Sequence, residues 1–75
     1  MAFRLASIEY NVNPGQTHFN IFERALGRIS MLVNGMSQFP NRDYTITGGI
    51  DAEWVSEDFT LAPGDVVELK YLTQD

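Results

Sequence analysis

The sequence predicts an all-β fold, namely a small antiparallel β-sandwich or partly open barrel of about six to seven short strands. Apolar and polar residues alternate with a period of two in most of the apolar segments, and no segment sustains a period of 3.6 residues. Turn residues recur about every eight to twelve positions, the spacing of short strands in such folds. With 75 residues, the chain is expected to form one domain, residues 1–75.

The composition points to a protein that depends on close packing or on partners. A chain of 75 residues buries only about 60% of its unfolded surface. It contains no cysteine, so neither a disulfide nor a thiolate metal site can brace it. The hydrophobic content of 44% is ordinary for a globular protein. Self-association or docking on a larger assembly would supply the missing stability.

The charge pattern argues against two classes of partner. Ten acidic residues oppose five basic ones, and the basic residues are scattered along the chain. Nucleic acids and anionic membranes are bound through clustered Lys and Arg, so we expect neither partner. No apolar run approaches the roughly 20 residues of a membrane helix, and the first ten residues do not resemble a signal peptide. We therefore expect a soluble protein made in a cytoplasm.

The first predicted strand, residues 3–12, changes phase along its length. Phe3 and Leu5 have one parity, whereas Ile8 and the apolar residues after it have the other. A β-bulge near residues 6–7 would reconcile the two halves. The alternative is an N-terminal arm that ends near this point and packs on something else.

The next segment contains a turn, a short strand and a connection. Asn-Pro-Gly at residues 13–15 predicts the turn, since Pro presets φ and Gly follows it. Residues 16–22 alternate, with Phe19 and Ile21 on one side. Residues 23–27 could form no more than one helical turn, so we interpret them as a connection.

Residues 28–39 predict a β-hairpin around Asn34 and Gly35. Asn-Gly between two apolar runs is the strongest short hairpin signal, because a type I′ turn needs positive φ at both central residues. The expected pairs are Val33 with Met36, Leu32 with Ser37 and Met31 with Gln38. One face, expected to fill the core, carries Ile29, Met31, Val33 and Met36. The other face carries Leu32 and Phe39, which we expect to meet a partner.

The C-terminal half predicts two further strand pairs. A strand at residues 44–47, starting at Tyr44, leads to Gly-Gly at 48–49, which signals a second two-residue hairpin loop. In the following strand, Ile50, Ala52 and Trp54 are expected to face inward. Residues 59–61 form a short strand or the approach to a turn. A turn with Gly64 and Asp65 then leads into the last strand, residues 66–72, whose inward residues are Val67, Leu69 and Tyr71.

No group of residues predicts catalysis or metal binding. Asp51, Glu53, Glu57 and Asp58 supply oxygen ligands of the kind that Ca²⁺ prefers, but they lack the glycine and the spacing of an EF-hand loop. Solvated outward charges account for them. His18 has no nucleophile elbow or Gly-rich oxyanion turn to accompany it. We therefore predict a non-enzymatic protein without catalytic residues, cofactor or metal ion.

An ordered set of segments carries a family resemblance. They are Q-T-H-F-N-I, then R-I-S-M-L-V-N-G-M-S-Q-F-P-N-R-D-Y-T-I-T, then L-A-P-G-D-V-V-E-L-K-Y. The set resembles the small β-modules of tailed-bacteriophage virion proteins, especially tail-fibre and appendage proteins, over residues 16–72. The core and turn residues of the pattern in this chain are Ile29, Met31, Val33, Asn34, Gly35, Met36, Tyr44, Trp54, Gly64, Asp65, Val67, Leu69 and Tyr71.

The resemblance implies a non-enzymatic structural protein of a phage virion, made in the host cytoplasm. We expect a homo-oligomer, a trimer in particular, that docks on a larger capsid, tail or fibre protein. The expected interface residues are Leu32, Phe39 and Phe22, and residues 1–15 are a candidate attachment arm. The alternatives are a capsid decoration (cement) protein and a receptor- or carbohydrate-binding module, in which Trp54 or Tyr44 would stack on a sugar.

Overall fold

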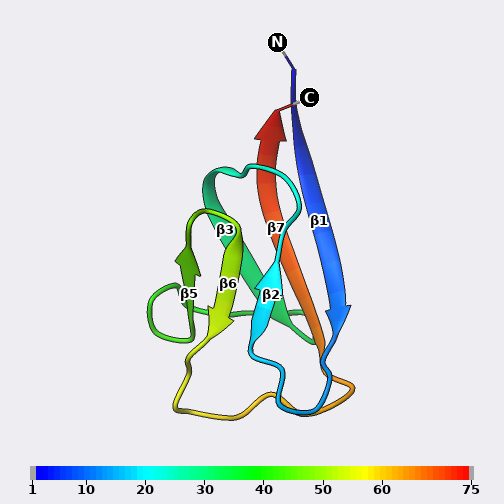
Figure 1. Cartoon of the computed structure of the whole chain (residues 1–75), viewed down its shortest axis with the longest axis vertical. Helices are drawn as coiled ribbons and strands as arrows, with labels where there is room; N and C mark the ends of the chain where they lie inside the picture. The colour runs from blue at the N-terminus through cyan, green and yellow to red at the C-terminus, as the bar shows by residue number, and fades with distance from the viewer. Residues whose placement is uncertain (1, 75) are drawn as a thin grey trace.

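The computed structural model describes residues 2–74, which form two antiparallel sheets (Figure 1). The strands are β1 (Phe3–Asn11), β2 (His18–Asn20), β3 (Leu26–Val33), β4 (Met36–Ser37), β5 (Tyr44–Thr47), β6 (Asp51–Trp54) and β7 (Val66–Gln74). One sheet has the order β1-β7-β3-β4 and the other β2-β6-β5. The predicted all-β fold is therefore confirmed. Among the described residues there is no helix that could cross a membrane.

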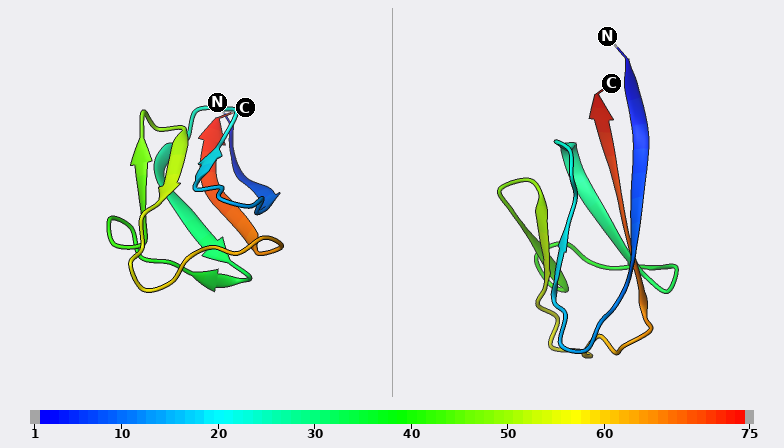
Figure 2. Two further views of the ribbon diagram at one scale, coloured as in Figure 1. Left: turned by 60° about the horizontal axis from the view of Figure 1, so that its bottom comes forward. Right: turned by 45° about the vertical axis from the view of Figure 1, so that its right-hand side comes forward.

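The hydrophobic core lies between the two sheets, which Figure 2 shows as separate layers in its right-hand view. Alternation places one face of each strand in this layer, as the sequence pattern predicts. The buried apolar residues are Val12, Phe19, Ile21, Ile29, Met31, Val33, Tyr44, Ala52, Trp54, Leu61, Val67, Leu69 and Tyr71. Tyr44 also donates a hydrogen bond from its hydroxyl to the Ile29 carbonyl at 2.9 Å, which links the two sheets.

Strand β7 is the central element of the larger sheet. It pairs along its whole length with β1 on one side. On the other side it pairs with β3 from Val67 to Leu72, with a shift of register between Leu26 and Ser30. Val67 and Leu69 are fully buried and Tyr71 is nearly so, as predicted. The strand runs two residues beyond the predicted end at residue 72, because Phe3 and Arg4 of β1 still pair with it there.

The predicted bulge in the first strand is wrong. Strand β1 pairs with β7 without a register shift, from Phe3 opposite Gln74 to Asn11 opposite Val66, so it is also not a detached arm. The phase change has another cause. At the end where β1 begins and β7 ends, these two strands extend past the smaller sheet (Figure 1). Phe3 and Leu5 point outward there, with 58% and 86% of their surface exposed.

The hairpin between β3 and β4 is confirmed in its turn and its register. Asn34 and Gly35 have φ of 50° and 84°, and Val33 pairs with Met36 around them. Met36 itself is not in the core, because 70% of its surface is exposed. Strand β4 has only two residues and lies at the edge of the larger sheet. At this edge no other described segment covers the side of the hairpin that carries Met36.

The second hairpin is wider than predicted. Thr47 pairs with Asp51, so three residues form the loop instead of the two glycines alone. Ile50 therefore belongs to the loop and is half exposed rather than inward-facing, whereas Ala52 and Trp54 are buried as predicted. Residues 59–61 form no strand and are the approach to the turn before β7.

Two phenylalanines test this core directly. Phe19 is completely buried, whereas 82% of the surface of Phe22 is exposed. We expect Phe19→Ala to lower the free energy of unfolding by about 3–5 kcal/mol, because it leaves a cavity between the sheets. The matched change Phe22→Ala should cost less than about 0.5 kcal/mol. Denaturant unfolding followed by tryptophan fluorescence measures both, and equal effects would contradict this core assignment.

Candidate functional site

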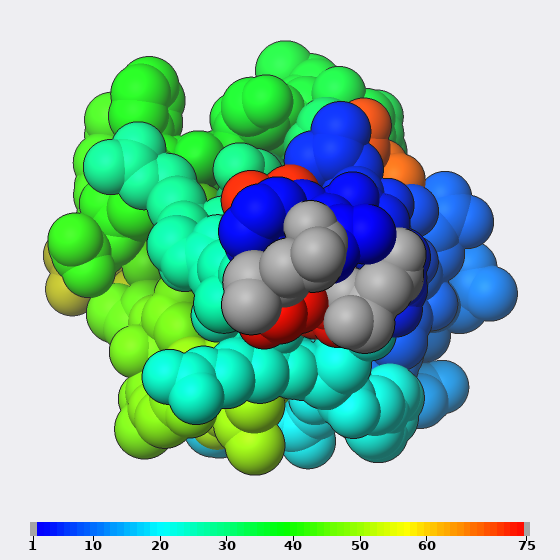
Figure 3. All heavy atoms as spheres, turned by 90° about the horizontal axis from the view of Figure 1, so that it is seen from above, coloured from blue at the N-terminus to red at the C-terminus, as the bar shows by residue number. Residues whose placement is uncertain are grey.

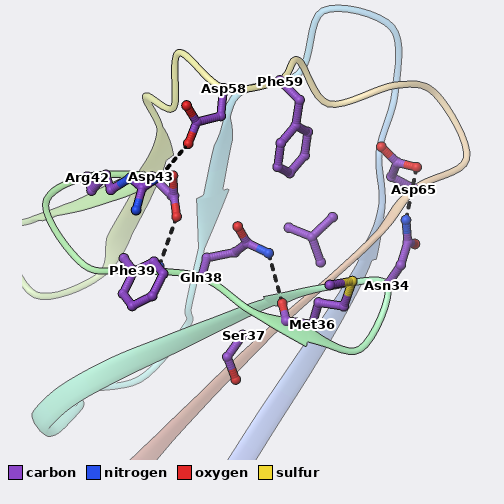
Figure 4. Close-up of a pocket in the computed structure, with 11 residues that line it drawn as sticks. Asn34, Met36, Ser37, Gln38, Phe39, Arg42, Asp43, Asp58, Phe59 and Asp65 are labelled. Carbon is purple, nitrogen blue, oxygen red and sulfur yellow. Dashed lines mark hydrogen bonds and ion pairs between the residues drawn. The ribbon is translucent and has the colours of Figure 1, made fainter.

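A surface hollow of about 500 Å³ lies between the β3–β4 hairpin and the loop that follows β6 (Figure 4). Two stretches far apart in the sequence meet here: residues 33–43, which form the hairpin and the turn before β5, and residues 58–65 of the loop that leads to β7. Its lining residues are Val33, Asn34, Met36, Ser37, Gln38, Phe39, Arg42, Asp43, Asp58, Phe59 and Asp65.

The rim of the hollow is apolar and exposed. Met36, Phe39 and Phe59 have 70%, 62% and 45% of their surface exposed. The ring of Phe59 is fixed by Trp54, at 4.9 Å between ring centroids, and the guanidinium of Arg42 lies 5.4 Å above the ring of Phe39. Both rings are therefore held by packing, so little rotamer freedom is lost when they bind a partner.

The buried carboxylate of Asp43 organises one side of the hollow. Its Oδ2 accepts a hydrogen bond from the Phe39 backbone N–H at 3.0 Å. Its backbone carbonyl accepts from Val55 and Ser56, which attaches the loop after β6 to the turn before β5. The hydrogen bond from Phe39 is the main cause that holds the pKa of Asp43 below its ordinary value, with smaller contributions from Ser56 and Arg42.

Asp65 and Asn34 join the other side of the hollow. Asp65 accepts hydrogen bonds from the Ala62 N–H at 2.8 Å and from the Asn34 side-chain amide at 3.1 Å. The bond from Ala62, followed by the one from Asn34, lowers the pKa of the Asp65 carboxyl. The Asn34 side chain also accepts from the Val66 N–H at 2.8 Å, while its backbone N–H donates to the Val66 carbonyl at 2.8 Å. The two turns that the sequence signals separately are thus connected directly.

The remaining charges of the hollow form a surface pair. Arg42 donates to Asp58 at 2.7 Å, and this hydrogen bond is the main cause that raises the pKa of Arg42. Asp43 and Asp65 already accept hydrogen bonds from other groups of this chain. The groups that remain available to contact a partner are therefore mainly the apolar side chains of the rim. The hollow is chemically suited to an apolar side chain. The lining carries three carboxylates against one guanidinium, which favours a partner with basic residues beside that side chain.

Three of the four acidic residues considered for a cation, Asp51, Glu53 and Asp58, lie next to a basic side chain. His18 lies between two of them, with Nδ1 at 3.0 Å from Asp51 and Nε2 at 3.7 Å from Glu53. Asp58 pairs with Arg42 on another part of the surface. Within residues 2–74, no three His, Cys, Asp or Glu side chains gather closely enough to hold a metal ion.

The three predicted interface residues do not form one surface. Phe39 is on the rim of the hollow, whereas Phe22 lies on the connection between β2 and β3. Leu32 is half-buried on the outer face of the larger sheet, opposite Ser37 and Glu68. Sequence reasoning missed Phe59 and the role of Asp65, because both reach the site through contacts across the fold.

The predicted sugar-stacking residues are not at the surface. Only 6% of Trp54 and 1% of Tyr44 is exposed, and the indole N–H of Trp54 donates to the Phe59 carbonyl at 3.2 Å. Neither ring offers a face on which a sugar could stack.

Comparisons of the chain with protein-family models, with curated proteins and with solved structures gave no match.

The Asn34 contacts can be separated from its backbone conformation. Asn34→Gly keeps the positive φ but removes the side-chain bonds to Asp65 and Val66. We expect this change to lower the free energy of unfolding by about 1–2 kcal/mol. Asn41 also has positive φ, at 67°, so Asn41→Gly is the matched control and should be nearly neutral. Urea unfolding compares them, and a neutral Asn34→Gly would refute the connection between the turns.

The lowered pKa of Asp43 predicts a pH dependence. Its carboxylate stabilises the folded state above the unfolded pKa, and this contribution is lost as the pH falls through the lower folded-state value. Asp43→Asn should therefore lower the thermal midpoint at pH 7, and its difference from the wild type should shrink below about pH 4. Asp58→Asn, which removes only an exposed ion pair, should have little effect at either pH. Circular dichroism melts at pH 7 and below about pH 4 measure the difference in thermal midpoint between Asp43→Asn and the wild type. A difference that is the same at both pH values would argue against this role of the Asp43 carboxylate.

Proposed function

We propose that this chain is a non-enzymatic structural protein of a tailed-bacteriophage virion. It acts as a small fibre- or tail-type or accessory module, through self-association and docking on a larger virion protein. The observation that carries the docking part is the exposed apolar rim of the hollow, formed by Met36, Phe39 and Phe59. The virion part is supported by the ordered segments that resemble phage β-modules.

Two turn elements of the pattern lie together in the fold. The V-N-G and G-D elements of the pattern lie more than 25 residues apart in the chain, at positions 33–35 and 64–65. In the fold their Asn34 and Asp65 side chains bond to each other and border the hollow. Two elements of the pattern therefore build one joint, which is a physical reason for these two elements to occur together.

The proposed occupant of the hollow is an apolar side chain of the larger protein, flanked by Lys or Arg. One large apolar side chain in such a site is the usual form of an interface anchor. The buried rings of Trp54 and Tyr44 favour this occupant over a sugar, because stacking on them would require opening the core.

The virion assignment is tested by electron microscopy. Gold-labelled antibodies against the folded chain should mark one repeated position on purified tailed-phage particles from the source of the sequence. The position separates fibre, tail and capsid roles. Particles that carry no label, and no peptide of the chain by mass spectrometry, would overturn the assignment.

The docking role of the hollow is tested with charged variants. In tagged chains supplied during particle assembly, Met36→Glu/Phe39→Glu should reduce incorporation into particles at least about tenfold, because carboxylates are placed on the apolar rim. Both positions are exposed, so the fold should be retained. Ile50→Glu, a similar change on the distant β5–β6 loop, serves as the control. Incorporation measured by immunoblot that is equal for all three chains would show that the hollow is not the docking site.

A further inference from the structure

Strand β1 is the longest edge strand in the described part of the fold. The other three strands at sheet edges, β4, β2 and β5, have two, three and four residues, whereas β1 has nine. Figure 1 shows β1 along one side of the molecule with no other segment on its outer side. Short edges resist pairing with another chain, and long regular edges invite it.

The backbone direction shows which groups of β1 are available. Just after the strand, the Val12 N–H donates to the Asp65 carbonyl at 2.8 Å, and the Val12 carbonyl accepts from the Gly64 N–H at 3.1 Å. Val12 therefore directs its backbone groups toward the β7 side. Because this direction alternates along an antiparallel strand, the N–H and C=O groups that point away from β7 belong to Phe3, Leu5, Ser7, Glu9 and Asn11.

An apolar patch adjoins the first part of this edge. On the outer face of the larger sheet, Leu5 lies opposite Leu72, which in turn lies opposite Leu26. Phe3, Leu5 and Leu72 have 58%, 86% and 37% of their surface exposed. Figure 3 views this end of the molecule, where the start of β1 and the end of β7 lie together at the surface. Single exposed apolar residues are common, but a cluster beside an open edge marks an interaction surface.

The edge also lacks the features that usually prevent pairing. Strand β1 contains no proline, no lysine and no bulge. Its only charged residues are Arg4, whose side chain is paired with Glu23, and Glu9 near the far end. Proline, lysine and bulges are the common protections of natural edge strands.

We propose that β1 pairs antiparallel with β1 of a second copy of this chain, with Leu5 on the two-fold axis. The inference rests on the self-association included in the proposed function and names its surface. In this register Leu5 lies opposite Leu5 of the copy, and Phe3 lies opposite Ser7. The two four-stranded sheets then become one continuous sheet. The apolar side chains of the two patches meet on its outer face.

Other registers are less favourable. With Ser7 on the axis, Leu5 would lie opposite Glu9 and Phe3 opposite Asn11, so each apolar residue would face a polar one. With Glu9 on the axis, two carboxylates would lie directly opposite each other, which is destabilising. The Leu5 register leaves Glu9 of both copies beyond the paired residues 3–7.

The geometry sets the stoichiometry and the strength of the assembly. An edge that pairs with itself uses the same surface on both copies and closes as a dimer. This differs from the trimer expected from the sequence. A five-residue ladder is smaller than a standard interface of about 1,600 Å², so we expect dissociation constants of about 10 µM to 1 mM rather than nanomolar values.

The test is sedimentation of the purified chain over this concentration range. The wild type should shift from a mass of 8.5 kDa toward twice that value. Leu5→Lys should weaken association at least about tenfold, because it places two ammonium groups at the axis. Ser7→Pro should do the same by removing an outward N–H, a position where an edge strand tolerates proline. Ile50→Lys, a similar change of an exposed apolar residue on the β5–β6 loop of the smaller sheet, should dimerise like the wild type.

Amide hydrogen exchange identifies the paired residues independently. At high concentration, the amides of Leu5 and Ser7 should become protected, whereas those of Glu9 and Asn11 should not. A wild type that stays at 8.5 kDa at 1 mM, or that forms a trimer, would overturn the inference. Association that neither Leu5→Lys nor Ser7→Pro weakens would also overturn the proposed pairing of β1, although it would still show that the chain self-associates. Incorporation of Met36→Glu/Phe39→Glu into particles tests docking separately.

Discussion

The fold depends on the joint between Asn34 and the start of β7. One side chain bonds both to the Asp65 carboxylate and to the Val66 N–H, and thereby fixes the hairpin turn against the strand that becomes the centre of the larger sheet. The register of β3 on β7 follows from this joint, since Val33 then lies opposite Val67. Strand β7 in turn pairs with β1 throughout. The joint therefore lies where the pairing of β3 with the central strand begins.

Local signals in the sequence predicted the turns and the inward faces well. Asn-Gly gave the first hairpin with its register, and the alternation of Val67, Leu69 and Tyr71 identified the buried side of β7. Such features depend on neighbours in the chain, so a single sequence can show them. One error was local, because the loop at residues 48–50 is one residue longer than the Gly-Gly signal indicates. The other errors occurred where a residue's surroundings come from distant segments. Met36 has the parity of a core residue, but nothing covers it.

The first strand shows the same limit. The change of phase was interpreted as a bulge, whereas the strand is regular and its first residues lie beyond the second sheet. The candidate site was predictable only in part. Phe39, which the sequence predicts to meet a partner, lies on the rim of the hollow, but Phe59 and Asp65 reach the hollow through a loop whose path depends on Asp43 and Trp54.

The proposed surfaces are at opposite ends of β7. The hollow adjoins the start of this strand, and the apolar patch adjoins its end, about 30 Å away for nine extended residues. One end can therefore dock on a larger protein while the other pairs with a copy. The two contacts do not compete for the same residues.

The pairing of Phe3 with Gln74 brings the first and last described strands side by side at one end of the molecule. Both connections to any neighbouring sequence leave through this single point. The domain can therefore be placed within a surface loop of another protein without separating the two sides of that loop, and β1 and β7 would still form their ladder. In a circular permutant, a short linker would join the two ends and the chain would be opened at the β5–β6 loop. Every strand pair should likewise be retained, and only β5 and β6 would no longer be connected by a loop.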